Sequence, residues 1–336
     1  MSTKLKIAAA VAAAVLLSAC SSPKHEPMPL VKFTPSMEVT EVWSKGLSSA
    51  EGFLVPAVYD DMVFAAGGKT LTRLNARTGE TEWSVSFNSP ITGGVGSDGY
   101  VTAVGLWDGN LEVVDAEGKV SWEKKLTTEL ASPPVVSHGL VIARTMDTRV
   151  SAFEASSGEL QWTYQRSQPA LTVRLPTRML AHDNFLLVGQ PNGHIVILDI
   201  ASGKPMFEFQ VAQAKGVTEV ERLVDVVGAP AFSDNLVCAA AFQGAVTCVD
   251  STNGQTRWTQ KIDAVAGPAI DEDNVYAVSV NGEVQAFYRE SGEQRWSNTA
   301  DFPRRSYSRA PWLSVMKTVM FISFRREPVK KWRVFV

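Results

Sequence analysis

The sequence lacks the residue patterns that most catalytic and metal sites require. Its 336 residues contain three cysteines and four histidines. The histidines have no spacing typical of a metal site, and the chain has no Gly-x-Ser-x-Gly elbow, no phosphate-binding P-loop and no Cys-x-x-Cys pair. Carboxylates such as Asp271 and Asp273 fall where turns between strands are expected, so we interpret them as solvated loop residues. Nothing in the sequence argues for catalysis, and no cofactor is expected.

The sequence also lacks an apolar run long enough to cross a membrane, for which about 20 residues are needed. Residues 7–19 form a run of thirteen apolar or small residues, preceded by two lysines, which is the pattern of a cleaved secretion signal. Its ending, Leu17-Ser-Ala-Cys20, resembles a bacterial lipobox, which implies a lipid anchor on Cys20. An ordinary signal with an incidental cysteine is the alternative. Because Ser21 is not the aspartate associated with inner-membrane retention, the resemblance implies the periplasmic face of the outer membrane.

Positive charge is scarce in the body of the chain. The formal net charge is −3, but residues 302–336 carry nine Lys or Arg against one acid, and residues 1–19 carry two Lys and no acid. Residues 20–301 therefore carry a net charge of −13. This acidic body argues against nucleic acid as a partner, because phosphate backbones are bound by clusters of Lys and Arg.

A repeated turn is the dominant feature that the chain does have. The stretch Cys248-Val-Asp-Ser-Thr-Asn-Gly-Gln-Thr-Arg-Trp258 runs from an apolar strand through an acidic residue to a glycine, with a tryptophan four residues after that glycine. The same spacing recurs, once with phenylalanine, at Gly79/Trp83, Gly118/Trp122, Gly158/Trp162, Gly203/Phe207 and Gly292/Trp296. Successive glycines are 39, 40, 45, 51 and 38 residues apart. A period near 40 residues indicates a repeat architecture.

Each unit has the composition of a four-stranded β-propeller blade. The glycine supplies the positive φ that closes a short turn, and a preceding aspartate such as Asp250 can accept backbone N–H bonds that hold the turn. The tryptophan carries more apolar surface than one blade can bury, so it must pack on a neighbouring blade. Turn signals such as Asp108-Gly109 and Gln243-Gly244 mark the central hairpin of a blade. We therefore predict an all-β fold, a β-propeller with six complete units.

The predicted propeller extends over residues 38–301. Glu38-Val-Thr-Glu-Val-Trp43 has the pattern of the last strand of a further unit, as when the first strand of a propeller closes its final blade. Two units exceed the period of about 39 residues, by 6 and 12 residues. The excess is expected between Trp162 and Leu187 and between Phe207 and Ala229. Insertions in propellers form loops on one face, where binding residues are common.

Cys238 and Cys248 flank the Gln243-Gly244 turn, and a two-residue hairpin would place them nearly opposite each other. The periplasm permits a disulfide. Cross-strand geometry is often unfavourable for that bond, and cysteine is a common small buried hydrophobe. Both interpretations stay open, and two free buried thiols are the favoured expectation.

The repeat pattern stops after Trp296. Residues 302–336 contain no glycine and nine basic residues. One interpretation is a basic segment for anionic membrane surfaces. The favoured interpretation is a reading-frame change that replaced the last blades. Recoding the 3′ end by one nucleotide should then restore another Gly-x-x-x-Trp-like unit, and finding no such open frame would contradict this expectation.

The unit that ends at Trp258 resembles the tryptophan-docking repeat of pyrroloquinoline-quinone-dependent dehydrogenases, eight-bladed enzymes with calcium and quinone on the central axis. Those enzymes carry a vicinal cysteine pair beside the quinone, which this sequence lacks. The predicted signal peptide (residues 1–19), the lipidated proline-rich tether (residues 20–37) and the repeat together resemble the BamB family, eight-bladed lipoproteins of the outer-membrane β-barrel assembly machinery.

This resemblance implies a non-enzymatic scaffold that docks on BamA and works with the other subunits of the machinery. Unfolded barrel precursors are a further expected partner, bound by exposed blade edges or a concave face. A periplasmic quinone-dependent dehydrogenase-like protein and another envelope-binding propeller are the alternatives.

The two long connections contain the residues that this resemblance singles out. The segment Leu171-Thr-Val-Arg174 resembles the one through which BamB proteins bind BamA. The segment Glu219–Val227 resembles a neighbouring acidic segment with two family aspartates, the second of which is replaced by Val227. The resemblance implies partner contacts from four residues: Leu171, Val173, Arg174 and Asp225. The alternatives are a buried strand that begins at Leu171 and an ordinary surface ion pair between Arg222 and Asp225.

Overall fold

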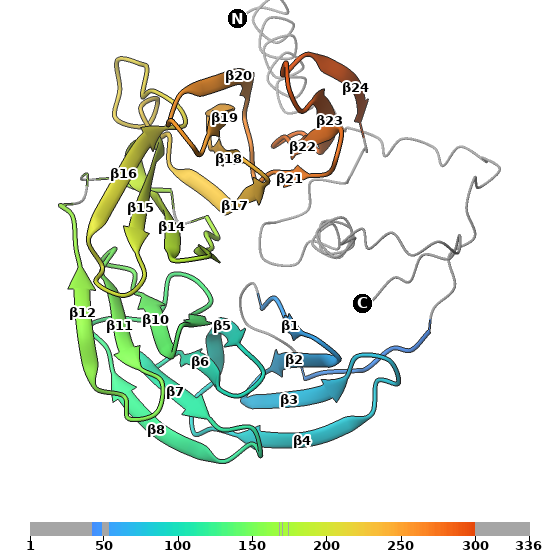
Figure 1. Cartoon of the computed structure of the whole chain (residues 1–336), viewed down its shortest axis with the longest axis vertical. Helices are drawn as coiled ribbons and strands as arrows, with labels where there is room; N and C mark the ends of the chain where they lie inside the picture. Colours follow the sequence, from blue (N-terminus) through green and yellow to red (C-terminus); the bar gives the residue numbers. More distant parts are fainter. Residues whose placement is uncertain (1–41, 49–53, 168, 170, 174, 300–336) are drawn as a thin grey trace, which may run out of the picture.

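The computed structural model in Figure 1 describes residues 42–48, 54–167, 169, 171–173 and 175–299. The described chain forms six antiparallel four-stranded sheets, arranged as successive blades around a common centre. Within each sheet the strands are paired in chain order, with one edge strand at the centre and the other on the rim. The predicted all-β propeller with six complete units is confirmed.

Blades 1 to 3 consist of β1 (Ala57–Tyr59), β2 (Met62–Gly67), β3 (Thr70–Asn75) and β4 (Thr81–Ser86); β5 (Ile91–Ser97), β6 (Thr102–Leu106), β7 (Asn110–Val114) and β8 (Val120–Lys125); and β9 (Val135–Ser137), β10 (Leu140–Arg144), β11 (Val150–Glu154) and β12 (Leu160–Tyr164). Blades 4 to 6 consist of β13 (Leu180–His182), β14 (Phe185–Gln190), β15 (His194–Asp199) and β16 (Pro205–Gln210); β17 (Val226–Ser233), β18 (Leu236–Ala241), β19 (Gly244–Asp250) and β20 (Thr256–Ile262); and β21 (Ala269–Ile270), β22 (Asn274–Val278), β23 (Glu283–Tyr288) and β24 (Gln294–Thr299). A short 3-10 turn, η2 (Pro191–Gly193), lies between β14 and β15.

The second and third strands of the blades form the core. Strands β6 and β18 are buried at every position, because the sheets pack face to face and cover both surfaces of their middle strands. The rim strands β4 and β8 are half-buried or exposed along their whole length. Continuous apolar runs in the sequence therefore become second strands, and the alternating polar segments that contain tryptophan become the rim.

The Gly-x-x-x-Trp turn has the same backbone geometry in successive blades. The φ of Gly203 is +67° and that of Gly292 is +71°. The N–H of Gly203 donates to the carbonyl of Asp199, and the N–H of Gly292 donates to the carbonyl of Tyr288, each at 2.8 Å. The carboxylate of Asp199 also accepts the N–H of Ser202 at 2.8 Å. Because the backbone bond forms at Tyr288 as well, the turn tolerates the loss of the aspartate.

Each of five tryptophans docks on the turn of the following blade. The indole Nε1 of Trp162 donates to the carbonyl of Ile200 at 2.8 Å, and the ring lies over Gly203, where a Cβ would come within 2.4 Å of Cε3. Four further tryptophans make the same pair of contacts, at 2.8–3.0 Å: Trp43, Trp83, Trp122 and Trp258. The ring of Phe207 lies over Gly254 without such a donor. The prediction that the tryptophans pack on the neighbouring blade is confirmed.

Trp43 belongs to the strand that we predicted to precede the first complete unit. Its ring lies over Gly79 and its Nε1 donates to Ala76 at 3.0 Å, although residues 42–48 form no regular strand. Residues 38–41 of that predicted strand lie outside the described residues. The same holds for the predicted signal peptide, for the tether with Cys20, and for residues 302–336.

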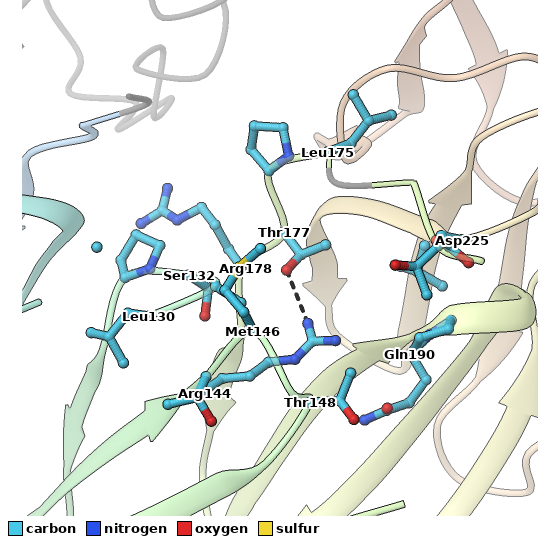
Figure 2. Close-up of a pocket in the computed structure, with 18 of the residues that line it drawn as sticks. Leu130, Ser132, Arg144, Met146, Thr148, Leu175, Thr177, Arg178, Gln190 and Asp225 are labelled. Atoms are coloured by element: carbon cyan, nitrogen blue, oxygen red, sulfur yellow. Dashed lines mark hydrogen bonds between the residues drawn. The ribbon is translucent and has the colours of Figure 1, made fainter. Parts of the chain in front are cut away.

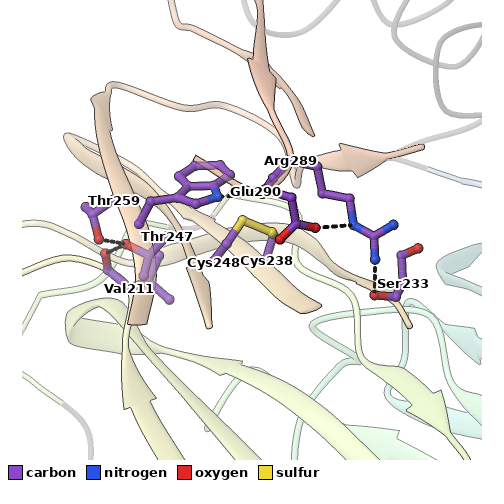
Figure 3. The surroundings of a disulfide bond; sticks show 9 residues. Val211, Ser233, Cys238, Thr247, Cys248, Thr259, Arg289 and Glu290 are labelled. Carbon is purple, nitrogen blue, oxygen red and sulfur yellow. Dashed lines mark hydrogen bonds and ion pairs between the residues drawn. A yellow bond between two sulfur atoms is a disulfide. The ribbon is translucent and has the colours of Figure 1, made fainter. Parts of the chain in front are cut away.

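Cys238 and Cys248 form a disulfide, so the favoured expectation of two free thiols is wrong (Figure 3). The two residues are direct partners in the register of β18 and β19, and their Cα atoms are 4.1 Å apart. Both are fully buried. Because the two cysteines lie directly opposite each other on neighbouring strands, their sulfur atoms are within bonding distance. The Gln243-Gly244 turn predicts this placement.

Candidate functional site

Two long connections, residues 165–179 between β12 and β13 and residues 211–225 between β16 and β17, lie where the repeat lengths predicted extra residues. The end of the first runs beside the start of β17, where Thr177 and Gly228 form a parallel bridge. The N–H of Gly228 donates to the carbonyl of Pro176, and the N–H of Arg178 donates to the carbonyl of Gly228, each at 2.9 Å. Two segments that are distant in the sequence therefore meet at one place on the propeller.

Asp225 joins these connections to blade 4. The residue is only 6% exposed, and its carboxylate accepts the N–H of Val173 from the first connection and the N–H of Asn192 from η2. Burial raises the pKa of the Asp225 carboxyl, while the two N–H bonds and the positive charge of Arg144 act in the opposite direction. Asp225 thus faces inward and fixes the position of Val173, rather than presenting its carboxylate on the surface.

Apolar side chains on both connections are exposed to solvent. The exposed fraction is 49% for Leu171 on the first connection and 89% for Val217 on the second, where Val220 is also exposed. Val173 is half-buried, and Arg174 lies outside the described residues. These side chains are accessible to a partner, and loops commonly carry binding residues.

The tip of the second connection has an ordered turn. The carboxylate of Glu221 accepts the N–H of Val217 at 2.9 Å and that of Thr218 at 3.0 Å, and these bonds are the main reason that its pKa is lowered. Arg222 Nε donates to the carbonyl of Gly216 at 3.2 Å. The turn therefore holds Val217 at the surface in a defined conformation.

The first connection also forms one wall of a central cavity of about 250 Å³ (Figure 2). Val173 and Leu175 line this wall. The opposite walls come from blades 2 to 5 and include Arg144 at the end of β10 and Gln190 at the end of β14. The first connection thus lines the cavity with Val173 and Leu175 and exposes Leu171 to solvent.

The described residues contain no group of three His, Cys, Asp or Glu side chains arranged to hold a metal ion. In that same part of the chain, no helix has both the length and the apolar character needed to cross a bilayer. The two connections offer exposed apolar side chains on a backbone that hydrogen bonds hold in place.

Sequence reasoning found the two connections but missed three of their features. Val217 and Val220 were not singled out, although they are apolar residues within a charged stretch, Lys215-Gly-Val-Thr-Glu-Val-Glu-Arg222. The contact between Val173 and Asp225 was also missed, since residues 52 positions apart give no local signal. Partner contacts by Leu171, Val173, Arg174 and Asp225 stay a prediction.

Comparison with known proteins places the chain among assembly factors. Residues 67–298 match the family model described as outer membrane protein assembly factor BamB. The chain is 38% identical over 256 residues to the BamB of Burkholderia pseudomallei, and 34% identical over 252 residues to that of Bordetella pertussis. These matches cover 74% and 73% of this chain, and 67% and 65% of the respective relatives. The chain thus spans about two thirds of the length of these relatives.

Solved structures agree with this result. The crystal structure of BamB from Moraxella catarrhalis matches with a TM-score of 0.73 and 28% identity, covering 80% of this chain and 81% of that one. The computationally designed Ika8 protein matches with a TM-score of 0.58 at 18% identity, covering 74% of this chain and 75% of that protein, and supports the fold alone. Because the matched family is one of assembly factors, the dehydrogenase alternative is set aside.

Proposed function

Because the chain belongs to the BamB family of outer membrane protein assembly factors, we propose that it is a non-enzymatic binding protein of the β-barrel assembly machinery. It docks on BamA, works beside the other subunits of that machinery, and aids the insertion of β-barrel proteins into the outer membrane. A lipid on Cys20 holds it at the periplasmic face of that membrane.

The observation that carries this proposal is the junction of the two long connections. Leu171 is exposed, while Val173, two residues further on, is fixed by the buried carboxylate of Asp225. A segment that is already ordered loses less conformational entropy when a partner binds. The junction therefore combines an exposed apolar side chain with a rigid support, which is the arrangement expected of an interface anchor.

A binding assay with the purified soluble region of BamA tests this role. We expect Leu171→Asp and Val217→Asp each to raise the Kd by at least about tenfold, because each places a charge in an apolar contact. Met206→Asp is the matched control, since Met206 is a similarly exposed apolar residue on the rim strand β16. Equal affinity of the two connection variants and this control would contradict the proposed docking surface.

Two further variants separate direct contact from support. Arg174→Ala should weaken the capture of BamA without unfolding the propeller, and unchanged association would remove Arg174 from the interface. Asp225→Asn leaves the surface chemistry unchanged but weakens the bond to the N–H of Val173. We expect it to raise the Kd through a faster dissociation rate, and circular dichroism of each variant checks that the sheets are intact.

A further inference from the structure

The central cavity is lined by a buried arginine, Arg144, at a strand position where the other blades have small or apolar residues. In each blade, the aliphatic residue at the start of the third strand pairs with one residue near the end of the second strand. In blade 3, Val150 pairs with Arg144. The residues at the equivalent position in the other five blades are small or apolar: Ala66, Gly105, Gly189, Ala240 and Val278. An arginine at this one position is a departure that the blade architecture does not require.

The charge of Arg144 is not neutralised by an ion pair in the described part of the chain. Arg144 is only 5% exposed. One guanidinium nitrogen, Nη1, donates to Oγ1 of Thr177 at 2.9 Å, and Nε has no hydrogen-bond partner (Figure 2). Burial lowers the pKa of Arg144 to about 10, and the negative charge of Asp225 opposes this shift. A cation in these surroundings lacks a counter-charge at close range.

Asp225 makes no hydrogen bond or ion pair with Arg144 in the described structure, although its charge acts on Arg144 from a distance. Its two carboxylate oxygens accept the backbone N–H groups of Val173 and Asn192. A second cation, Arg178, lines the same cavity, and burial lowers its pKa as well. Two arginines and one carboxylate give the cavity a net positive charge.

Neutral donors with no partner line the same space. Nε2 of Gln190 and Oγ of Ser132 are buried and make no hydrogen bond in the described structure. Buried polar atoms without partners are rare in folded proteins. A water molecule would satisfy such donors, but it would leave the charge of Arg144 without compensation.

We propose that this cavity binds a small anion with one carboxylate or phosphate group, and that Arg144 is its principal ligand. Arg144, Gln190 and Ser132 line the cavity, and each has a buried donor atom without a hydrogen-bond partner in the described structure, namely Nε, Nε2 and Oγ. A volume of about 250 Å³ lies below the range of about 300–1,000 Å³ that drug-sized ligands occupy, so the ligand is a small one. The exposed side chain of Met146 lines the cavity and marks its opening to solvent.

The test is a titration of the purified chain with inorganic phosphate and, separately, with acetate. Calorimetry measures the Kd, and thermal unfolding is measured at each anion concentration against sodium chloride of equal ionic strength. At least one of the two anions should bind saturably, with a Kd of about 1 mM or tighter, and should raise Tm. The anion that binds more tightly identifies the group as phosphate or carboxylate. Failure of both anions to bind would overturn the proposal.

Arg144→Gln is the decisive variant, because glutamine keeps a donor for Thr177 but removes the charge. It should weaken anion binding by at least about tenfold without lowering Tm in anion-free buffer, since it removes a buried charge that has no ion-pair partner. Arg77→Gln is the control, because Arg77 is an exposed arginine that is paired with Asp61 on blade 1. An equal anion effect in the wild type and both variants would show a general salt effect and overturn the proposal.

A second variant keeps the test valid if Arg144→Gln does not fold. Gln190→Glu preserves the size of the side chain and replaces an unpartnered donor by a negative charge. It should also weaken anion binding by at least about tenfold, because like charges repel at short range. Wild-type affinity in this variant would contradict the location of the site.

Discussion

The docked tryptophans at the rim and the lining residues of the central cavity differ in how their buried polar groups are satisfied. At the rim, the indole N–H of Trp162 meets a carbonyl at 2.8 Å, and its ring covers a glycine of the next blade. At the centre, Arg144 and Gln190 keep buried nitrogen atoms that no described group satisfies. The rim contacts recur from blade to blade, whereas the central groups occur once. Repetition therefore marks the residues that build the ring, and departures from the repeat mark the residues that are available for binding.

The largest expected effect breaks one rim contact. Trp162 is 9% exposed and docks on Gly203, whereas Trp296 is 42% exposed and contacts no glycine of the described chain. Trp162→Ala should lower the free energy of unfolding by about 3–5 kcal/mol, and Trp296→Ala by about 1 kcal/mol. Urea unfolding monitored by circular dichroism measures both losses. Equal losses would mean that docking on the next blade is not what makes the rim tryptophans stabilising.

The glycine beneath the indole gives the second contrast. Gly203 and Gly139 both have positive φ, +67° and +71°, but a Cβ would meet the ring of Trp162 only at Gly203, and nothing lies within 4 Å at Gly139. Gly203→Ala should cost about 2–4 kcal/mol from backbone strain and overlap together, and Gly139→Ala about 1–2 kcal/mol from strain alone. The difference between the two unfolding free energies isolates the cost of displacing the indole. A difference of zero would show that only φ matters at these turns.

A smaller, pH-dependent effect is expected in blade 2, where a buried acid has no cationic partner among the described residues. Glu112 on β7 lies opposite Glu123 on β8, and burial, followed by the charge of Glu123, raises the pKa of Glu112 to about 7. Between pH 4.5 and pH 7 the folded protein holds a proton on Glu112 that the unfolded chain releases, so stability falls as the pH rises through this window. Glu112→Gln should remove this slope and raise the free energy of unfolding at pH 8 by about 1–2 kcal/mol.

Unfolding curves at pH 5, 6, 7 and 8 measure the effect of Glu112→Gln. The control is Glu82→Gln, since Glu82 is a strand glutamate on β4 that pairs with Arg73 at 2.6 Å. A slope that persists in the Glu112 variant would assign the pH dependence to another group.

The smallest expected effect is a gain. Phe207 occupies the rim position of blade 4 and lies over Gly254, but it has no N–H to donate. Phe207→Trp would place an indole N–H near the carbonyl of Ser251. Ser251 lies three residues before Gly254, just as Ile200, which accepts the indole N–H of Trp162, lies three residues before Gly203. The added hydrogen bond should stabilise the fold by up to about 1 kcal/mol, which a shift of the urea midpoint would report. A loss of stability would show that the contact between residue 207 and the turn at Gly254 accommodates only the smaller ring.

The repeating parts of the fold were predictable because the same physical requirement recurs. A glycine for the turn, a tryptophan four residues later and an apolar second strand appear in nearly every unit, so one pattern predicted six blades. The glycine has a second role, because the indole of the preceding blade lies flat against it. The sequence did not predict this role, since it depends on a contact between residues about 40 positions apart.

The singular parts of the molecule were less predictable. Repeat length located both long connections, but nothing local in the sequence shows that Asp225 turns inward to Val173. The disulfide was missed although the opposition of Cys238 and Cys248 was predicted, because opposition alone does not decide between a bond and two packed thiols. Arg144 did carry a signal, since it stands where the other blades have small or apolar residues, but only the strand register makes that comparison possible.

The measurement that tests the proposed docking most directly is hydrogen–deuterium exchange of the chain with and without the soluble region of BamA. We expect BamA to slow exchange at residues 169–179 and 211–225, and to leave the rim strands β4 and β8 unchanged. The backbone N–H of Val173, which already donates to Asp225, should be among the protected groups. Protection confined to the rim strands, with no change in either long connection, would contradict docking through the two connections.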